Sequence, residues 1–294
     1  MSNTRTDRHS TTISLNSKYM EINDPQTAKA GALSCSRKHI QLRPTVAPFA
    51  RALSILSSFT TSERWLGNSD LVTRTGLPPS TVTRITHSLV SLGYLLYTKE
   101  CRKYCLGPAV LALGYGASGD VATVQRYANE HMRAFSERYQ LPVTLSTRDR
   151  WNLIVIESCQ TVTLPYALQL SIGSRLCLTK SAVGWALLAS LPDKERQFLM
   201  NNARNRMQDD KGRMQLRIEE AINHVREKGF CVSPSEAGQP MTMIAAPVKV
   251  PGHAPLALCC MGPATWMNRN RTTRELGPAL TYLAQEIQHE GLAS

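Results

Sequence analysis

The chain has 294 residues, enough for two domains with separate cores, and its formal net charge of +12 comes from 34 basic and 22 acidic residues. It has no apolar run near the ~18 residues of a membrane span and no apolar signal core at its N-terminus, so we expect a soluble, cytoplasmic protein. Residues 1–44 and 45–118 each carry 7 basic and 3 acidic residues, whereas residues 119–294 carry 20 and 16. The concentration of positive charge near the N-terminus favours a polyanionic partner, either a nucleic acid or an anionic membrane surface.

The first predicted helix follows a segment without regular structure. Residues 1–44 are rich in Ser, Thr, Asn and isolated charges and show no hydrophobic period, which predicts a disordered, weakly basic tail. From Pro48 onward, large apolar residues recur at helical spacing between Phe49 and Phe59. We therefore predict a helix that ends around Ser58.

The stretch from Asn68 to Leu92 predicts two helices joined by a tight turn. Asn68 or Ser69 can cap the first helix by accepting an unpaired backbone N–H, and Gly76 suits a left-handed exit. Pro79 fits the first turn of the second helix, where a missing N–H costs nothing.

The second of these helices has two different sides. One side is apolar and is predicted to be buried, and no acidic residue occurs between Asp70 and Lys99. A polar helix face is often only a solvated surface, but the recognition helix of a helix-turn-helix combines a buried stripe with hydroxyls and an arginine that reach base edges and phosphates. The buried stripe would be Val82, Ile85, Leu89 and Leu92, and the DNA contacts would be Ser80, Thr81, Thr83, Arg84 and His87.

Two short strand-like runs follow, residues 94–97 and 103–106. The intervening residues 98–102 would form a hairpin tip with exposed cations. Three helices and a basic hairpin indicate a winged helix-turn-helix domain over residues 45–106, whose wing places Arg102 and Lys103 near phosphates or the minor groove.

Residues 107–119 begin with Gly-Pro and end in glycines, which predicts a linker helix and a hinge. Within them, residues 114–119 (Gly-Tyr-Gly-Ala-Ser-Gly) match the GxGxxG pattern of dinucleotide-binding folds. That site needs a buried strand, which residues 110–113 could supply, and a second parallel strand soon afterwards. Residues 121–139 instead predict one long helix. An enzyme or sensor that binds a nucleotide or another ligand, without binding DNA, is the alternative to a DNA-binding protein.

The remaining residues, 120–294, predict a sheet interleaved with helices, an α+β or α/β sensing domain. A turn is expected at residues 149–150, and a helical, highly charged segment at residues 195–228 is expected to break near 209–212. The predicted strands are 142–147, 153–158, 162–171, 230–233, 242–250 and 256–261, and the other predicted helices are 179–191 and 272–290.

No catalytic or metal-binding set is evident. The sequence lacks GxSxG, HExxH and P-loop patterns, so we expect neither an enzyme nor a cofactor. Its eight cysteines contain no CxxC pair and are best explained as reduced, mostly buried residues. Cys101 and Cys105 lack a histidine pair, and the adjacent Cys259 and Cys260 would point to opposite faces of a strand, so no zinc site is predicted. His131, His224 and His253 are isolated.

Several of these stretches together resemble one family. Residues 51–56 (Arg-Ala-Leu-Ser-Ile-Leu), 75–84 (Thr-Gly-Leu-Pro-Pro-Ser-Thr-Val-Thr-Arg), 92–94 (Leu-Gly-Tyr) and 104–108 (Tyr-Cys-Leu-Gly-Pro) resemble the N-terminal domain of IclR-type transcriptional regulators. Residues 170–176, 181–189, 229–233, 244–248 and 262–263 resemble the second domain of that family, in the same order. The similarity covers about residues 45–290.

The resemblance implies a winged-helix DNA-binding domain, a linker helix and a GAF-like effector-binding domain. It also implies a dimer or a pair of dimers on a palindromic operator, and a small organic acid as effector. Residues 170–176 look most like members that govern aromatic-acid breakdown in a catabolic operon.

By position, the resemblance places the effector contacts on small or apolar residues, several of them larger and less polar here than in members that bind very small acids. This implies a bulkier, partly apolar ligand, or a pocket that no longer binds one. Trp185 stands where the family usually has a basic residue. Arg175 could pair with a carboxylate, or it could be a surface arginine at the end of a strand. The remaining candidate contacts are Ala182, Val183, Ser233, Met241, Met243, Cys259 and Met261.

Overall fold

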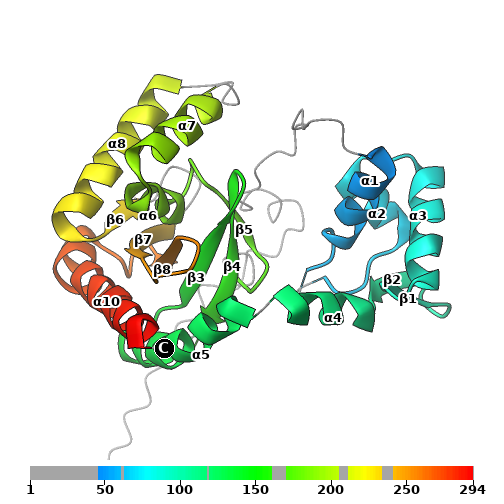
Figure 1. Ribbon diagram of the computed structural model, residues 1–294, viewed down its shortest axis with the longest axis horizontal. Coiled ribbons are helices and arrows are strands. Elements are labelled where there is room, and N and C mark those ends of the chain that lie inside the picture. The colour runs from blue at the N-terminus through cyan, green and yellow to red at the C-terminus, as the bar shows by residue number, and fades with distance from the viewer. Residues whose placement is uncertain are drawn as a thin grey trace, which may run out of the picture.

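The computed structural model describes residues 46–60, 63–117, 119–160, 170–204, 211–233 and 241–293. These residues form a small N-terminal lobe and a larger C-terminal lobe, joined through helices α4 (Pro108–Ala117) and α5 (Gly119–Tyr139) (Figure 1). The predicted tail lies outside the described residues, as does most of the strand predicted over 162–171. Within the described ranges, no helix is both long and apolar enough to cross a membrane.

The N-terminal lobe is the predicted winged helix-turn-helix. It consists of three helices and a two-stranded antiparallel hairpin, and Leu66 adds a backbone bridge to Tyr104 of the hairpin. Its core includes the fully buried Ile55, Leu71 and Val82. The elements are α1 (Ala47–Leu56), α2 (Asn68–Thr75), α3 (Pro79–Ser91), β1 (Leu95–Thr98) and β2 (Lys103–Leu106).

The start of α2 differs from the prediction. Gly67, rather than Asn68 or Ser69, is the N-cap, and its N–H donates to the Asp70 carboxylate at 2.8 Å. The Asn68 amide instead donates to the Thr83 hydroxyl at 3.1 Å, which ties the start of α2 to α3. Only the prediction at the other end of α2 is confirmed, because Gly76 has a left-handed φ of 67°.

The buried side of α3 also needs one correction. Leu92 is the C-cap of the helix and is exposed, because the chain turns away at Gly93 with a left-handed φ of 76°. Thr86 is fully buried on this helix instead, and it satisfies its hydroxyl by donating to the Thr83 carbonyl at 3.0 Å. Val82 and Leu89 are buried as predicted.

The C-terminal lobe is built on a six-stranded antiparallel sheet in the order β5-β4-β3-β8-β7-β6. An antiparallel sheet with helices on its faces confirms the α+β class. The three-residue strand β5 was missed because a run that short carries no period. The strands are β3 (Val143–Asp149), β4 (Asn152–Cys159), β5 (Arg175–Cys177), β6 (Cys231–Ser233), β7 (Met241–Val248) and β8 (Leu256–Pro263).

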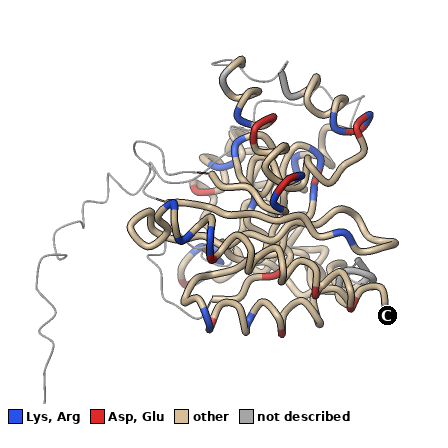
Figure 2. The backbone as a smooth tube through the Cα atoms, turned by 90° about the vertical axis from the view of Figure 1, so that its left-hand side faces the viewer, with Lys and Arg blue, Asp and Glu red and all other residues tan. Residues whose placement is uncertain are grey.

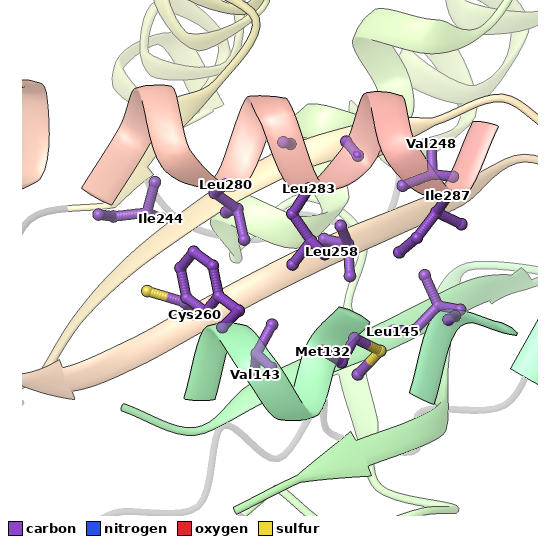
Figure 3. Close-up of a cluster of buried hydrophobic side chains, with 14 of the residues drawn as sticks. Met132, Val143, Leu145, Ile244, Val248, Leu258, Cys260, Leu280, Leu283 and Ile287 are labelled. Carbon is purple, nitrogen blue, oxygen red and sulfur yellow. The ribbon is translucent and has the colours of Figure 1, made fainter. Parts of the chain in front are cut away.

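Helices cover both faces of this sheet. Helix α5 and the C-terminal helix α10 (Gly277–Ala293) pack on one face, where side chains such as Met132, Leu258 and Leu283 interdigitate (Figure 3). Helix α6 (Ala182–Ser190) packs on the other face, and α7 (Asp193–Arg204) and α8 (Lys211–Lys228) contribute to the same buried cluster. We call the sheet face under α6 the α6-side face.

Two further segments bear on the predictions. Residues 110–113 are helical within α4, in the segment predicted as a linker helix, so the strand that the alternative of a dinucleotide-binding turn needs before the GxGxxG stretch is not there. Helix α6 starts at Ala182, three residues later than predicted, because Ser181 caps it by accepting from the Gly184 N–H at 3.2 Å.

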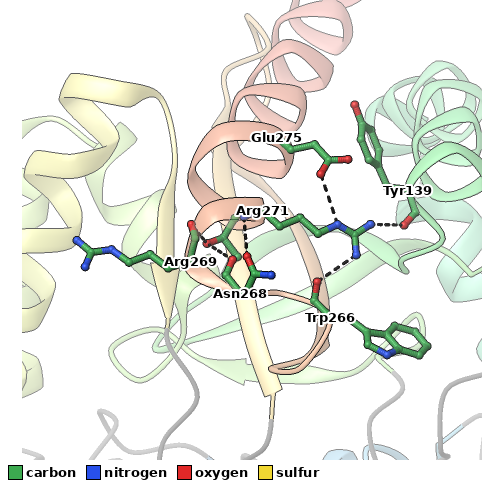
Figure 4. A network of polar contacts seen from close by, with 7 residues as sticks. Tyr139, Trp266, Asn268, Arg269, Arg271 and Glu275 are labelled. Atoms are coloured by element: carbon green, nitrogen blue, oxygen red, sulfur yellow. Dashed lines mark hydrogen bonds and ion pairs between the residues drawn. The ribbon is translucent and has the colours of Figure 1, made fainter.

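The last predicted helix is also interrupted. It begins as α9 (Arg269–Arg271), continues as a π-helical turn, η3 (Thr272–Leu276), and then becomes α10. Arg271 holds this junction, since its guanidinium donates to the carbonyls of Trp266 at 3.1 Å and Tyr139 at 3.2 Å (Figure 4). The end of α5 is thereby tied to the segment that leads into α10.

Candidate DNA-binding surface and effector face

Helix α3 presents its polar side to solvent because its apolar side packs on α1, α2 and β1. Ser80, Arg84 and His87 are exposed, and within the described residues none of their side chains makes a hydrogen bond or ion pair. Free donors on an exposed helix face can reach base edges and phosphates in a major groove. These three are the residues on the predicted face that are available for direct contact.

The threonines on the same helix are less free than predicted. The Thr83 hydroxyl donates to the Pro79 carbonyl at 3.0 Å and accepts from the Asn68 amide, while Thr81 is half-buried. Ser88 likewise donates back to the Arg84 carbonyl at 3.1 Å. The Thr83 hydroxyl therefore links α3 to the start of α2, and its predicted contact with DNA would compete with these two hydrogen bonds.

The hairpin presents the cations that were predicted for it, and Lys99 is exposed there as well. Lys103 begins β2 and is exposed, and Arg102 lies at the tip with a left-handed φ of 51°. The hairpin is stiffened by packing of the Tyr97 and Tyr104 rings, whose centroids are 4.9 Å apart. A rigid hairpin with cations at its tip is suited to contact phosphates.

The acidic residues of this lobe do not neutralise α3. Asp70 accepts the N-terminal N–H of α2, and Glu63 forms an ion pair with Arg74, which also donates to the Ser58 carbonyl at 2.9 Å. Glu100 is exposed on the hairpin. The α3 face therefore keeps its positive charge.

The α6-side face brings most of the predicted effector residues together. Residues directly opposite one another on antiparallel strands share a face, and Met243 pairs with both Met261 and Ser233 in the register. One buried cluster contains Ala182, Val183, Met243, Cys259 and Met261, with Met241 packed against it. Ser233 is half-buried at the edge of the sheet.

Arg175 lies apart from this cluster. It is exposed at the start of β5, at the opposite edge of the sheet from β6, and its guanidinium forms an ion pair with Asp149. Its cation is therefore already partly compensated by a carboxylate. Sequence patterns could not reveal this ion pair, because the two residues are brought together only when β5 pairs with β4.

Two polar residues of the α6-side face were missed. Thr144 is 1% exposed and pairs with Cys259, and Ser146 is 0% exposed and pairs with Ala257. Neither hydroxyl has a hydrogen-bond partner among the described residues. A buried hydroxyl without a partner costs about 1–3 kcal/mol, so two of them on one apolar face suggest a role beyond folding.

A β-bulge lies beside these hydroxyls. Thr144 pairs with Ser158 of β4, whereas Ser146 pairs with Val155, so β4 carries an extra residue between them. The carbonyl of Ile156, in that extra stretch, accepts a hydrogen bond from the Gln125 amide of α5. The bulge thus connects the α6-side face to the helix that continues from the linker.

Burial favours the thiol form of the two adjacent cysteines of β8, Cys259 and Cys260. Burial raises the pKa of Cys259 well above its ordinary value of 9.0, with smaller effects from Cys260 and Cys231. Burial also raises the pKa of Cys260 to about 12. In the described part of the chain, no cluster of three or more His, Cys, Asp or Glu residues could hold a metal ion.

Comparisons with known proteins agree with both halves of this geometry. The family model described as the IclR helix-turn-helix domain matches residues 49–98, and the one described as the bacterial transcriptional regulator IclR C-terminal matches residues 118–289. The HTH-type transcriptional regulator TsaQ1/TsaQ2 of Comamonas testosteroni is 35% identical over 243 residues, 82% of this chain and 87% of that protein. The Pca regulon regulatory protein of Pseudomonas putida is 25% identical, covering 82% of each chain.

Solved structures show the same arrangement. An IclR family transcriptional regulator from Brucella abortus is 30% identical with a TM-score of 0.67, covering 84% of this chain and 94% of that one. An IclR homolog from Microbacterium hydrocarbonoxydans, complexed with 4-hydroxybenzoate, is 21% identical with a TM-score of 0.65, covering 84% and 100%.

Proposed function

Because the chain belongs to the IclR family of transcriptional regulators, we propose that it controls a catabolic operon in response to a small organic acid of the aromatic type. The family is one of DNA-binding regulators rather than enzymes, with an effector-binding C-terminal domain. The observation that carries the DNA-binding part is the exposed, uncompensated face of α3, where Ser80, Arg84 and His87 have no partners among the described residues.

Arg84 is the residue that we assign to base readout. A bidentate arginine–guanine contact contributes about 1–3 kcal/mol of discrimination, so Arg84→Ala should weaken operator binding by that amount. Fluorescence anisotropy with the upstream region of the protein's own gene, alongside a scrambled duplex, measures the difference. Arg274→Ala, an exposed arginine in the other lobe, is the matched control. Equal operator affinity of Arg84→Ala and wild type would refute the assignment.

We place the effector on the α6-side face. The unpaired hydroxyls of Thr144 and Ser146 can donate to a carboxylate or phenol, and the surrounding Met243, Cys259 and Met261 provide an apolar wall. A few polar groups in an apolar site are typical of small-molecule pockets. A solved protein of this fold holds 4-hydroxybenzoate, which makes that acid the first compound to test.

The test is calorimetric titration of the purified chain with 4-hydroxybenzoate and related acids. Ser146→Ala should weaken binding at least tenfold, because it removes one hydrogen bond to a charged group, a contribution of about 1.5–3 kcal/mol. Ser190→Ala is the control, since that hydroxyl donates within its own helix to the Leu187 carbonyl. Tight binding that is indifferent to Ser146 would place the effector elsewhere.

The oligomer that we propose is a dimer formed through α1 and α4. Phe49 and Leu53 of α1 are 72% and 55% exposed, and Leu111 and Tyr115 of α4 are also exposed on a helix that contains no charged residue. We propose that a second copy of the chain covers the exposed apolar residues of both helices. A dimer is needed in any case, because two recognition helices must contact half-sites about one helical turn apart.

Light scattering during gel filtration tests this interface. Phe49→Ser combined with Leu53→Ser should convert the dimer to a monomer, whereas Leu216→Ser, which alters an equally exposed leucine on α8, should not. A dimer that survives the double substitution would exclude this surface.

A further inference from the structure

A hollow of about 510 Å³ lies at the β6 edge of the sheet, and its described lining shares no residue with those assigned to the effector. Its walls come from α6, α8, β6, β7 and the α9–η3 junction. Volumes of about 300–1,000 Å³ are typical of small-molecule sites. The floor is apolar, with Trp185, Ala221 and Met267 among the lining residues, each of them buried.

The rim of the hollow carries more positive than negative charge. Lys228 comes from α8 and Arg269 from α9, and Glu220 is the one carboxylate among the described residues that line the hollow. Lys228 and Arg269 are exposed and form no ion pair among the described residues. Figure 4 shows the Arg269 side chain pointing away from the Arg271 network, so it does not take part in holding the α9–η3 junction.

These cations are not part of a general basic surface. Figure 2 faces this side of the molecule and shows Lys and Arg positions interspersed with Asp and Glu positions. The hollow brings Lys228 of α8 and Arg269 of α9, far apart in the sequence, to one rim.

Thr242 provides an independent indication of a ligand. Its side chain lines the hollow, is only 5% exposed, and has no hydrogen-bond partner among the described residues. The adjoining wall contains Thr272 and Thr273, the first residues of the π-helical turn η3. Such turns occur frequently at functional sites.

We propose that this hollow is a second small-molecule site, for an organic anion with a carboxylate and an apolar body. The carboxylate would lie at the rim between Lys228 and Arg269, the Thr242 hydroxyl would donate to it, and the apolar body would rest on Trp185 and Met267. A charged head with apolar surface behind it matches this combination better than a bare inorganic anion, which would leave the apolar floor uncovered.

The experiment is calorimetric titration of the full chain with benzoate, benzamide and inorganic phosphate. Benzoate should bind, and binding at this site should fall at least tenfold in the double variant Lys228→Gln/Arg269→Gln and several-fold in Thr242→Val. Arg274→Gln is the control, since Arg274 is exposed on η3 but does not line the hollow. Benzamide and phosphate should each bind at least tenfold more weakly than benzoate.

The variants distinguish binding at the hollow from binding at the α6-side face. If benzoate occupies both, wild type should bind two equivalents and the double variant one, whereas Ser146→Ala should affect only the effector face. Because both rim residues are exposed, the double variant should keep the wild-type melting temperature. Equal binding of benzamide, absence of benzoate binding, or a stoichiometry and affinity unchanged in the double variant would each overturn the proposal, whatever the outcome for the effector face.

Discussion

Replacing Thr144 by Val should stabilise the C-terminal lobe while it weakens effector binding. The two side chains have nearly the same shape, so the substitution leaves no cavity. Thr144 is 1% exposed and its hydroxyl has no partner among the described residues, so the folded protein bears a desolvation cost of about 1–3 kcal/mol that valine removes. A lobe of this size gains about 2–4 °C in Tm for each kcal/mol.

Differential scanning calorimetry is the appropriate assay, because the two lobes need not unfold in one transition. Thr272→Val provides the matched control: Thr272 is also buried in this lobe, but its hydroxyl donates to the Asn268 and Arg269 carbonyls, both at 3.0 Å. That variant should lose about 0.5–1.5 kcal/mol. If Thr144→Val is destabilised as much as Thr272→Val, the Thr144 hydroxyl is satisfied in the folded protein and the reasoning about the α6-side face fails.

Three further substitutions or reactions test other parts of the structure. Lys103→Ala should weaken binding to all DNA duplexes about equally and lower the slope of log affinity against log salt by about 1, measured by anisotropy between low and moderate salt. Gly184→Ala should destabilise the C-terminal lobe by about 3 kcal/mol or more in urea unfolding, because the added Cβ would lie 1.9 Å from a backbone carbonyl oxygen. Gly212→Ala is the control: its added Cβ has no atom within 4 Å, so that variant should be neutral or stabilising. Iodoacetamide at pH 8 should modify the exposed Cys101 within the described ranges and leave Cys259 unmodified, since burial raises its pKa, as peptide mass mapping would show.

Local sequence signals predicted the DNA-binding lobe well. The apolar period of α3, the left-handed Gly76 and the helix-starting Pro79 each act within a few residues, and the structure has all three. The errors in this lobe are also local. Asp70 accepts a hydrogen bond from Gly67, so the N-cap lies at Gly67, one residue nearer the N-terminus than Asn68. Leu92 is exposed because α3 ends immediately before it.

The residues of the α6-side face were only partly predictable, because their hydrogen-bond partners depend on strand register. Alternation along residues 143–146 indicates that Thr144 and Ser146 share a face, but whether their hydroxyls find partners depends on β4 and β8, which pair with β3 from more distant parts of the chain. The same limit applies to Arg175, whose pairing with Asp149 requires β5 beside β4. The hollow at the β6 edge brings together residues from 185 to 273, and periodicity carries no information about that convergence.

We expect a signal from the α6-side face to reach the DNA-binding lobe through α5, because α5 follows the linker helix α4 in the chain. The Gln125 amide of α5 donates to the Ile156 carbonyl at the bulge, beside the positions paired with Thr144 and Ser146. A ligand that forms hydrogen bonds with those hydroxyls would shift the bulge and, through it, α5. Gln125→Leu should therefore leave effector affinity and operator affinity nearly unchanged when each is measured alone.

The coupling between the two sites should nevertheless be lost in Gln125→Leu. Allosteric coupling typically changes affinity by about 5–150-fold, and it acts equally in both directions. Operator titrations with and without saturating effector, repeated as effector titrations with and without DNA, close the thermodynamic cycle. Gln215→Leu is the control, because that glutamine bonds to Glu219 within α8. If the coupling factor of Gln125→Leu equals that of the control, the bulge does not transmit the signal, and the linker must sense the effector through other contacts between α5 and the sheet.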